Sequence, residues 1–358
     1  MTFSGRTREL GRLRGLLDRR DPQVVRVTGL RGGGKTTLVT RVLADYDGLI
    51  HRCPPLPEPV QQLRLRDQIE RERAARGLRP LDFATGSAEG WRGLLGAVTD
   101  LSGEGDGARP FVLALDDAHR LGEARARHVE AIVAALREVA TQSRTLHVVL
   151  IGHEGSVPGE ESFAPHPTET VQVGPLPLRA AATHLPGSRP EDRVRAYGIF
   201  GGIPHVLEAL DPTVTVGTNV RRMILTTGER LSEASSTWLE QDIQAPARYF
   251  AIMSALARGE ADWSTVHSGV PDLTRSGQVA PYLNRLGELG LITARRSLDA
   301  GPRSRSTRYA IADPFLAFWF RFVLPYRFQA EPQSVSQYYA HGVRPALDDH
   351  LSRPHHPR

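Results

Sequence analysis

A glycine-rich segment that contains the only lysine of the chain is the first candidate for chemistry. Residues 29–36 read G-L-R-G-G-G-K-T and match the pattern G-x-x-x-x-G-K-[ST]. In this pattern, backbone amides surround phosphate oxygens, the lysine reaches the β- and γ-phosphates, and the hydroxyl binds Mg²⁺. A slim ammonium fits between phosphates better than a planar guanidinium, and every other strong cation of this sequence is an arginine. The predicted phosphate-binding residues are Gly29, Gly32, Gly33, Gly34, Lys35, Thr36 and Thr37.

The residues on either side of this loop favour a strand before it and a helix after it. Residues 24–28 are short and rich in valine, as in a buried parallel strand. Residues 37–43 place Leu38, Val39 and Val42 on one helical face. In the order strand, loop, helix, the loop amides and the positive helix end converge on a phosphate. A chance glycine-rich turn is the alternative, and the full pattern in this context argues against it.

A second segment predicts a metal ligand and a catalytic base. Residues 111–117 read F-V-L-A-L-D-D, an apolar strand that ends in two acids, as in a Walker B motif. We expect Asp116 to hold Mg²⁺ together with the hydroxyl of Thr36, and Asp117 to orient or deprotonate the attacking water. Aspartate is one methylene shorter than the glutamate usual at the second position, which favours slow hydrolysis. A buried strand that merely ends in capping aspartates is the structural alternative.

Alternating strand and helix patterns predict a doubly wound parallel sheet with nucleotide at the carboxyl ends of its strands. Further strands are expected at 48–52, 146–151 and 171–173, and helices with one apolar face at 91–98 and 124–140. Residues 61–76 carry sparse apolar side chains and predict an exposed, solvated helix. The predicted domains are an α/β P-loop ATPase core at 1–185, a helical lid at 186–245, a winged helix at 246–312, and an aromatic helix with a short C-terminal segment at 313–358.

Length and composition narrow the protein class. A chain of 358 residues predicts two or three domains. No apolar run is long enough to span a bilayer, and no signal-peptide pattern opens the chain, so we expect a cytoplasmic protein without a membrane partner. A single cysteine excludes an internal disulfide. The histidines show no H-E-x-x-H or zinc spacing, and N-K-x-D cannot occur with one lysine, which favours ATP over GTP.

The C-terminal half predicts a partner-binding module. Residues 247–292 have the helix order of a winged helix, and 295–308 form a basic loop that resembles a wing. The net charge of +5 is compatible with DNA, but an arginine-rich composition produces the same charge without it. We favour docking onto a protein partner or a second copy, with weak nonspecific DNA affinity. The candidate contact residues are Arg275, Asn284, Arg303, Arg305 and Arg308.

Several segments together resemble a known family. F-x-G-R-x-x-E-L at 3–10, followed by the glycine loop, is similar to the opening of the STAND branch of AAA+-related ATPases. This resemblance implies that Gly5 and Arg6 lie near adenine and that His153, after the strand at 146–151, senses the γ-phosphate. A histidine there is unusual, and a capping or surface role is equally open. The G-G-I-P at 201–204 is similar to a lid element of STAND and archaeal-type ATPases, which implies that Pro204 packs near the base. A simple helix break is the alternative.

One more block points to a subset of that family. Residues 309–322 read Y-x-I-x-D-P-F-L-x-F-W-x-R-F, which resembles archaeal-type ATPases whose C-terminal domain is related to PD-(D/E)xK nucleases. No lysine follows Lys35, so the nuclease lysine is missing and no DNA cleavage is expected. The G-R pair that relatives carry after the sensor strand is also missing from 162–170. We therefore expect an ATP- and Mg²⁺-binding ATPase with low turnover that works as a switch or assembly module, or alternatively an ATP-gated DNA-binding regulator.

Overall fold

The computed structural model describes residues 5–83, 85, 88–101, 110–121, 146–153, 168–187, 189–233, 246–270, 273, 276–296, 307–329 and 333–352. Its contacts divide the chain into two compact units. The sheet unit consists of Arg6–Gly29 and Gly34–Gly174. The C-terminal unit consists of Met1–Gly5, Leu30–Gly33 and Pro175–Arg358. The helix predicted at 124–140 lies outside the described residues.

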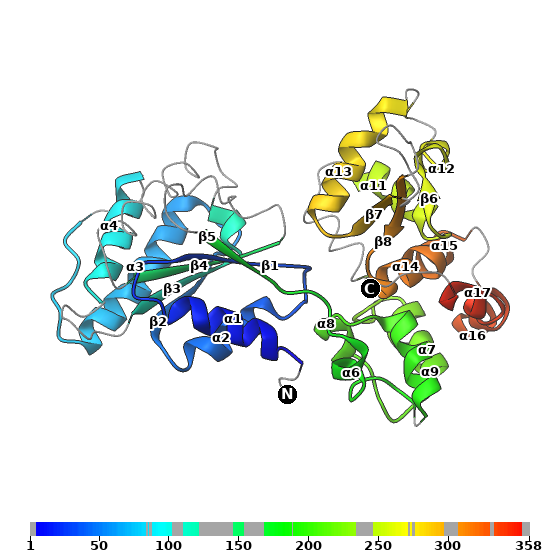
Figure 1. Cartoon of the computed structure of the whole chain (residues 1–358), viewed down its shortest axis with the longest axis horizontal. Helices are drawn as coiled ribbons and strands as arrows, with labels where there is room; N and C mark the ends of the chain where they lie inside the picture. Colours follow the sequence, from blue (N-terminus) through cyan, green and yellow to red (C-terminus); the bar gives the residue numbers. More distant parts are fainter. Residues whose placement is uncertain are drawn as a thin grey trace. The chain divides into compact units, whose positions relative to one another are not determined.

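A five-stranded parallel sheet forms the centre of the sheet unit, which confirms the predicted α/β class (Figure 1). The strand order is β2-β3-β4-β1-β5. β3 and β4 are buried along their whole length, as expected of strands covered on both faces. The strands are β1 (Val24–Thr28), β2 (Asp47–Arg52), β3 (Phe111–Asp116), β4 (Leu146–Ile151) and β5 (Thr168–Gln172).

Helices cover both faces of this sheet (Figure 1). α3 (Glu58–Ala75) and α4 (Ala88–Thr99) pack together, and their apolar side chains form one core with Leu113, Leu115 and Val148 of the strands. α1 (Thr7–Leu17) and α2 (Lys35–Leu43) contact each other; α1 contacts β5, and α2 contacts β2 and β3. The predicted apolar faces of α2 and α4 are confirmed, since Leu38, Val39 and Val42 and likewise Trp91, Leu94, Leu95 and Val98 are buried.

The prediction of an exposed helix at 61–76 was wrong. α3 buries Leu65 and Ile69 completely, and it also buries the polar side chains of Gln62 and Arg73. Their polar atoms have partners, as burial requires: Gln62 donates to Glu58 (3.2 Å), and Arg73 pairs with Asp100 (2.7 Å). α3 has few apolar residues, so its sequence did not indicate a buried face. Paired polar side chains make up the rest of that face.

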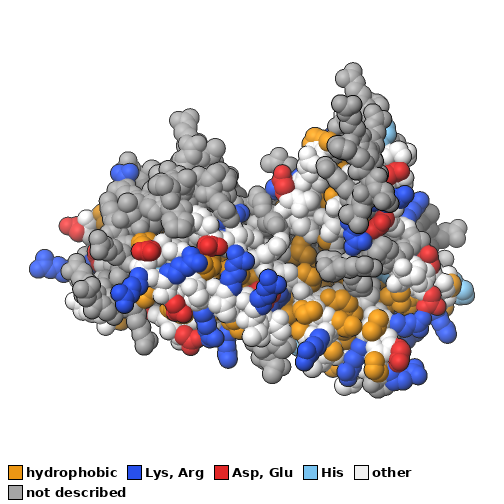
Figure 2. All heavy atoms as spheres, in the orientation of Figure 1, with side chains coloured by type: hydrophobic (Ala, Val, Ile, Leu, Met, Phe, Trp, Pro, Cys, Tyr) orange, Lys and Arg blue, Asp and Glu red, His pale blue; other side chains and the backbone are white. Residues whose placement is uncertain are grey.

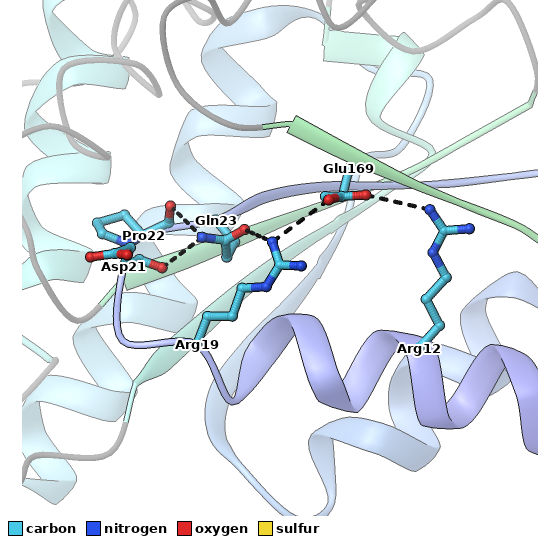
Figure 3. Close-up of polar contacts among 6 residues, drawn as sticks. All are labelled: Arg12, Arg19, Asp21, Pro22, Gln23 and Glu169. Carbon is cyan, nitrogen blue, oxygen red and sulfur yellow. Dashed lines mark hydrogen bonds and ion pairs between the residues drawn. The ribbon is translucent and has the colours of Figure 1, made fainter.

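An arginine pair attaches α1 to the edge strand β5. Figure 3 shows Arg12, in the middle of α1, and Arg19, just after the end of α1, pointing toward Glu169 on β5. The nitrogen–oxygen distances to Glu169 are 3.4 and 3.6 Å, and Arg19 also donates to Gln23 at 3.2 Å. All three charged side chains are at least one-third exposed, so each pair contributes well below about 1 kcal/mol. The buried leucines of α1 dominate its docking.

The C-terminal unit contains helices and one small antiparallel sheet. Its segment from 246 to 311 has the order helix, strand, helix, helix, strand, strand, and the sheet order is β6-β8-β7. These elements are α11 (Pro246–Leu256), β6 (Ala261–Asp262), α12 (Trp263–Ser268), α13 (Ala280–Glu288), β7 (Ile292–Arg296) and β8 (Thr307–Ile311). Before them come α6 (Leu178–Ala181), α7 (Pro190–Phe200), α8 (Pro204–Leu207), α9 (Val216–Asn219) and the π-helical turn Val220–Leu225.

The predicted aromatic helix is confirmed and is buried in this unit. α14 (Pro314–Phe318) continues through the π-helical turn Trp319–Val323 into α15 (Leu324–Arg327). Phe250 of α11 makes edge contacts with the rings of Trp319 and Phe320. α16 (Val335–Tyr338) and α17 (Leu347–Leu351) close the described chain. Among the helices of the described residues, none is long and apolar enough to cross a bilayer.

Asp313 caps this aromatic helix from a fully buried position. Its Oδ1 accepts hydrogen bonds from the backbone amides of Phe315 (2.9 Å) and Leu316 (3.2 Å), whereas its buried Oδ2 has no hydrogen-bond partner among the described residues. Burial raises the pKa of Asp313 to about 7, despite the two amides that lower it. A side chain at Gly201 could not be accommodated, because its Cβ would lie 2.8 Å from Oδ2.

We expect Asp313 to make the stability of the protein fall with rising pH. The folded state holds this proton up to a pKa of about 7, whereas the unfolded chain releases it near 3.8. The stabilising contribution of Asp313 to the free energy of unfolding is therefore fully present below pH about 4 and is lost between pH 4 and 7, on the order of 4 kcal/mol. Asp313→Asn keeps the capping oxygen without the titration. Urea unfolding, followed by tryptophan fluorescence at several pH values, should show a shallower pH dependence in the variant; equal slopes would contradict this assignment.

Candidate nucleotide-binding site

The glycine loop between β1 and α2 adopts backbone angles that glycine alone accepts readily. Gly29, Gly32 and Gly34 have φ values of 147°, 71° and 86°. Gly34 is the N-cap of α2, which begins at Lys35. A Cβ at Gly29 would lie 2.2 Å from the carbonyl oxygen of Val173. The glycines are thus required by the turn itself, and the turn leads directly into the first amides of α2, the positive end of that helix.

Lys35 is buried at the start of α2, with 7% of its surface exposed. Its Nζ donates a hydrogen bond to the carbonyl oxygen of Gly29 at 3.0 Å, so the ammonium lies across the loop. A buried cation is stable only with negative or dipolar partners. The loop carbonyl is one such partner, and a phosphate oxygen is a stronger one because it is ionised. Thr37, in contrast, is exposed on α2.

Thr36 and Asp116 meet, as the sequence predicts for a shared metal. Thr36 Oγ1 lies 3.0 and 3.1 Å from the two carboxylate oxygens of Asp116. Asp116, the last residue of β3, is 96% buried, since only 4% of its surface is exposed. One carboxylate and one hydroxyl at this spacing suit Mg²⁺, which takes few protein ligands and completes its shell with phosphates and water. The described residues hold no cluster of three His, Cys, Asp or Glu that would suit a metal bound by protein alone.

Asp117 has a left-handed backbone conformation, with φ at 55°. Aspartate tolerates this region better than most residues, but a non-glycine residue there is uncommon. The conformation turns the backbone amide of Asp117 back onto Asp116 Oδ1, at 3.2 Å. The same turn places the carboxylate of Asp117, which is half-buried, immediately after the strand end. Its role as the base stays a prediction.

His153 follows β4, the strand between β1 and β3 in the sheet. The preceding Gly152 donates its amide to the carbonyl oxygen of Val27 at 3.1 Å, which extends the sheet up to His153. Only 5% of the His153 surface is exposed. This placement, next to the strands that carry the glycine loop and Asp116, is compatible with a phosphate sensor, and that role also stays a prediction.

The two residues expected near adenine belong to different surroundings. Arg6 is buried at the start of α1 and pairs with Glu9 at 2.9 Å. Gly5 lies in the C-terminal unit with φ at 77°, where a Cβ would be 2.2 Å from Cβ of Ala180. Both residues therefore have a structural role in the turn that leads into α1, independent of any role in binding adenine.

Pro204 is the first residue of α8, and its neighbour contacts the glycine loop. The amide of His205 donates to the carbonyl oxygen of Gly32 at 3.2 Å, and Ile203 and His205 both lie against Gly32. These residues and loop residues 30–33 belong to the same unit. The lid-like segment at 201–205 is thus attached to the backbone of the phosphate-binding loop.

The sequence reasoning missed Arg52. It is the last residue of β2, in register with Asp116 on β3, and its Nε lies 3.5 Å from Asp116 Oδ2. The next residue, Cys53, donates its amide to the Asp116 carbonyl oxygen at 2.8 Å. The sequence predicted that the strand ends at Arg52, but it did not predict that β2 is the neighbour of β3, which brings Arg52 to Asp116.

The predicted partner-binding residues fall partly outside the described residues, namely Arg275, Arg303 and Arg305. Asn284 is exposed on α13, whose Leu283 and Leu286 are buried in the core. Arg308 is exposed on β8 and in register with Arg295 of β7. Basic and acidic side chains are interspersed over most of the described surface seen in Figure 2.

Comparison with known families identifies the first part of the chain. Residues 2–151 match the family described as AAA ATPase domain. This part of the chain is an AAA ATPase domain. The matched range includes the glycine loop, Lys35, Thr36, Asp116 and Asp117.

Known proteins resemble the chain at low identity. The structure of a Walker-type ATPase of Pyrococcus abyssi is 18% identical, covers 88% of this chain and 95% of its own, and has a TM-score of 0.60. It supports the P-loop fold of the chain. A STAND protein of Pyrococcus horikoshii with a tetratricopeptide repeat sensor is 13% identical and covers 98% of this chain and 47% of its own, but its TM-score of 0.38 is too low for argument.

One curated relative also matches. An uncharacterized protein of Methanocaldococcus jannaschii is 23% identical over 184 residues, which make up 50% of this chain and 41% of that protein. The chain thus aligns with less than half of that relative. The resemblance of residues 309–322 to nuclease-related ATPases stays a prediction.

We expect Lys35→Ala to weaken ATP binding about tenfold to 150-fold. The variant removes a charge-assisted contact to phosphate, worth about 1.5–3 kcal/mol. Calorimetric titration with ATP in excess Mg²⁺ measures the effect. Thr40→Ala, an exposed change on the same helix, should bind like the wild type. Equal affinity of Lys35→Ala and Thr40→Ala would exclude the loop as the phosphate site.

Proposed function

We propose that the chain binds ATP with Mg²⁺ and hydrolyses it slowly to ADP and phosphate, as a nucleotide-dependent switch or assembly module. The observation that supports this most directly is the 3.0 Å contact between Thr36 and Asp116 within an AAA ATPase domain. In this contact, the hydroxyl of the residue after the loop lysine meets the carboxylate at the end of β3. This pair has the composition of a site for a metal that also binds phosphate.

In this proposal, each residue of the site has one task. The loop amides and Lys35 bind the β- and γ-phosphates, and Thr36 and Asp116 hold Mg²⁺. Mg²⁺ held there would supply positive charge against the negative charge of the transferred phosphoryl group. Asp117 orients the attacking water and accepts its proton. Adenine is the base, because a chain with one lysine cannot carry the N-K-x-D motif that reads guanine.

Two features support slow turnover. Asp117 has a shorter side chain than glutamate, and its backbone is fixed in a left-handed turn, so its reach toward a γ-phosphate is limited. The sequence between 162 and 170 also lacks the G-R pair that would supply an arginine finger. An arginine supplied by another protomer or a partner can raise turnover on the order of 10³-fold or more. We therefore propose that assembly stimulates hydrolysis.

Asp117→Asn should remove turnover and leave ATP binding intact. The amide has nearly the same shape and also tolerates the left-handed turn, but it cannot accept a proton. Steady-state phosphate release is expected to fall at least about 100-fold, while calorimetry gives an unchanged ATP affinity. Asp67→Asn, an exposed change on α3, serves as the matched control. Rapid turnover by the isolated wild-type chain, or full activity of Asp117→Asn, would refute the proposed role.

Residues 246–311 support a proposal for the surface through which the switch acts on a partner. Its order of three helices and three strands resembles that of a winged helix, and in this proposal the β7–β8 connection serves as the wing. Arg295 and Arg308 lie opposite each other at the base of that connection, and Arg295 pairs with Glu260 at 3.4 Å. We propose that the wing docks onto an acidic surface of a protein partner or a second copy. DNA binding is the second candidate, and it would be weak and nonspecific.

Changing Arg303, Arg305 and Arg308 to alanine should weaken DNA binding about equally for all sequences. Phosphate contacts carry no sequence information, and each lost contact lowers the salt slope by about 0.9. Fluorescence anisotropy with several duplexes at several salt concentrations measures both effects. Asn284→Ala is the control, because it changes the exposed face of α13 without changing charge. A strong preference for one duplex that is lost in Asn284→Ala would show instead that α13 reads sequence.

A further inference from the structure

The carboxylate of Asp116 has three partners among the described residues around it. Thr36 donates to it from the start of α2, and the amide of Asp117 donates to it from the turn after β3. Arg52 adds a full positive charge, with Nε 3.5 Å from Oδ2. The carboxylate is 94% buried, whereas the arginine side chain is 74% exposed. The ion pair therefore joins a fixed, buried acid to a cation that can move into solvent.

The sheet determines this pairing. Residues 47–52 of β2 are in parallel register with residues 111–116 of β3, and Arg52 is the direct partner of Asp116. Neighbouring strands are about 4.8 Å apart, so the base of the arginine side chain cannot leave the vicinity of the acid. Only the guanidinium group of Arg52 can move between the carboxylate of Asp116 and other positions. Among the described residues, Asp116 is the only ion-pair partner recorded for Arg52.

Mg²⁺ and this guanidinium have opposing requirements at the same atom. A Mg²⁺ ion held by Thr36 and Asp116 would bring two positive charges to the same carboxylate that Arg52 pairs with. The ion would repel the guanidinium of Arg52 at its present distance. Water screens this repulsion only in part, because the Asp116 side chain is buried. The ion must therefore displace the arginine end, or bind more weakly.

We infer that Arg52 is a positioning residue that competes with Mg²⁺ for Asp116, so that the metal enters efficiently only together with nucleotide phosphates. This inference rests on the proposed nucleotide site. The phosphates contribute the extra negative charge that the metal needs to displace Arg52, which keeps Asp116 paired otherwise. The released guanidinium remains at the carboxyl edge of the sheet. Arg52 thus couples metal loading to nucleotide loading without contacting the nucleotide in the loaded site.

The test compares Mg²⁺ demand in variants of the full chain. Binding of a fluorescent ATP analogue, mant-ATP, is titrated first in EDTA and then with increasing Mg²⁺. Arg52→Gln should lower the half-saturating Mg²⁺ concentration about two- to fivefold, the effect that an exposed ion pair can supply. Its affinity for mant-ATP in EDTA should equal that of the wild type. Arg52→Lys keeps the charge and should stay close to the wild type.

Two controls separate competition from a general charge effect. Arg41→Gln removes an exposed arginine from the last turn of α2 and should leave the Mg²⁺ midpoint unchanged. In an Asp116→Asn background, Arg52→Gln should have no further effect, since the shared group is gone. An unchanged midpoint in Arg52→Gln overturns the inference. Weaker mant-ATP binding by Arg52→Gln in EDTA also overturns it, because Arg52 would then bind phosphate.

A measurement without nucleotide distinguishes failure of this inference from failure of the proposed function. Mn²⁺ added to the chain alone is followed by electron paramagnetic resonance. Arg52→Gln is expected to bind Mn²⁺ about two- to fivefold more tightly than the wild type, whether or not the wild type binds mant-ATP. Absence of mant-ATP binding with a tighter Mn²⁺ site would reject the nucleotide proposal and keep the competition. Equal Mn²⁺ affinities would reject the competition.

Discussion

The parallel register of the sheet is the constraint on which the site depends. All five strands of the sheet unit run the same way, so their carboxyl ends meet at one edge. β1 delivers the glycine loop there, β3 delivers Asp116, β4 delivers His153, and β2 delivers Arg52. A shift of one residue between β2 and β3 would turn Arg52 away from Asp116 and expose the apolar face of β2. The chemistry of the site is therefore fixed by the same hydrogen bonds that stabilise the fold.

The backbone conformation of the loops at that edge also determines where the site residues lie. Three glycines with positive φ let the loop turn into α2, and Asp117 accepts a conformation that few residues adopt. The turn at Asp117 directs its amide toward the carboxylate of Asp116, and the turn at Gly34 leaves the first amides of α2 at the positive end of that helix. The site gathers donors and cations around one buried carboxylate, which explains why the competition between Arg52 and a metal is built into it.

The C-terminal unit shows a second case of a carboxylate kept where water cannot reach. Asp313 caps the aromatic helix with one oxygen, and among the described residues the other oxygen has no hydrogen-bond partner, a cost that burial of Phe315, Phe318 and Trp319 offsets. The same unit contacts the phosphate-binding loop through the hydrogen bond from His205 to Gly32.

The sequence by itself determined the parallel α/β fold, the strands and helices around the loop, the AAA-type resemblance and the pairing of Thr36 with Asp116. These features follow from short-range patterns: fixed loop spacing, apolar strands, and one helical face. It could not determine that α3 is packed, because its buried face depends on pairs such as Arg73 with Asp100. Nor could it reveal Arg52, because an arginine at a strand end has no local signature. Only the tertiary structure, which makes β2 the neighbour of β3, brings its guanidinium to the buried carboxylate.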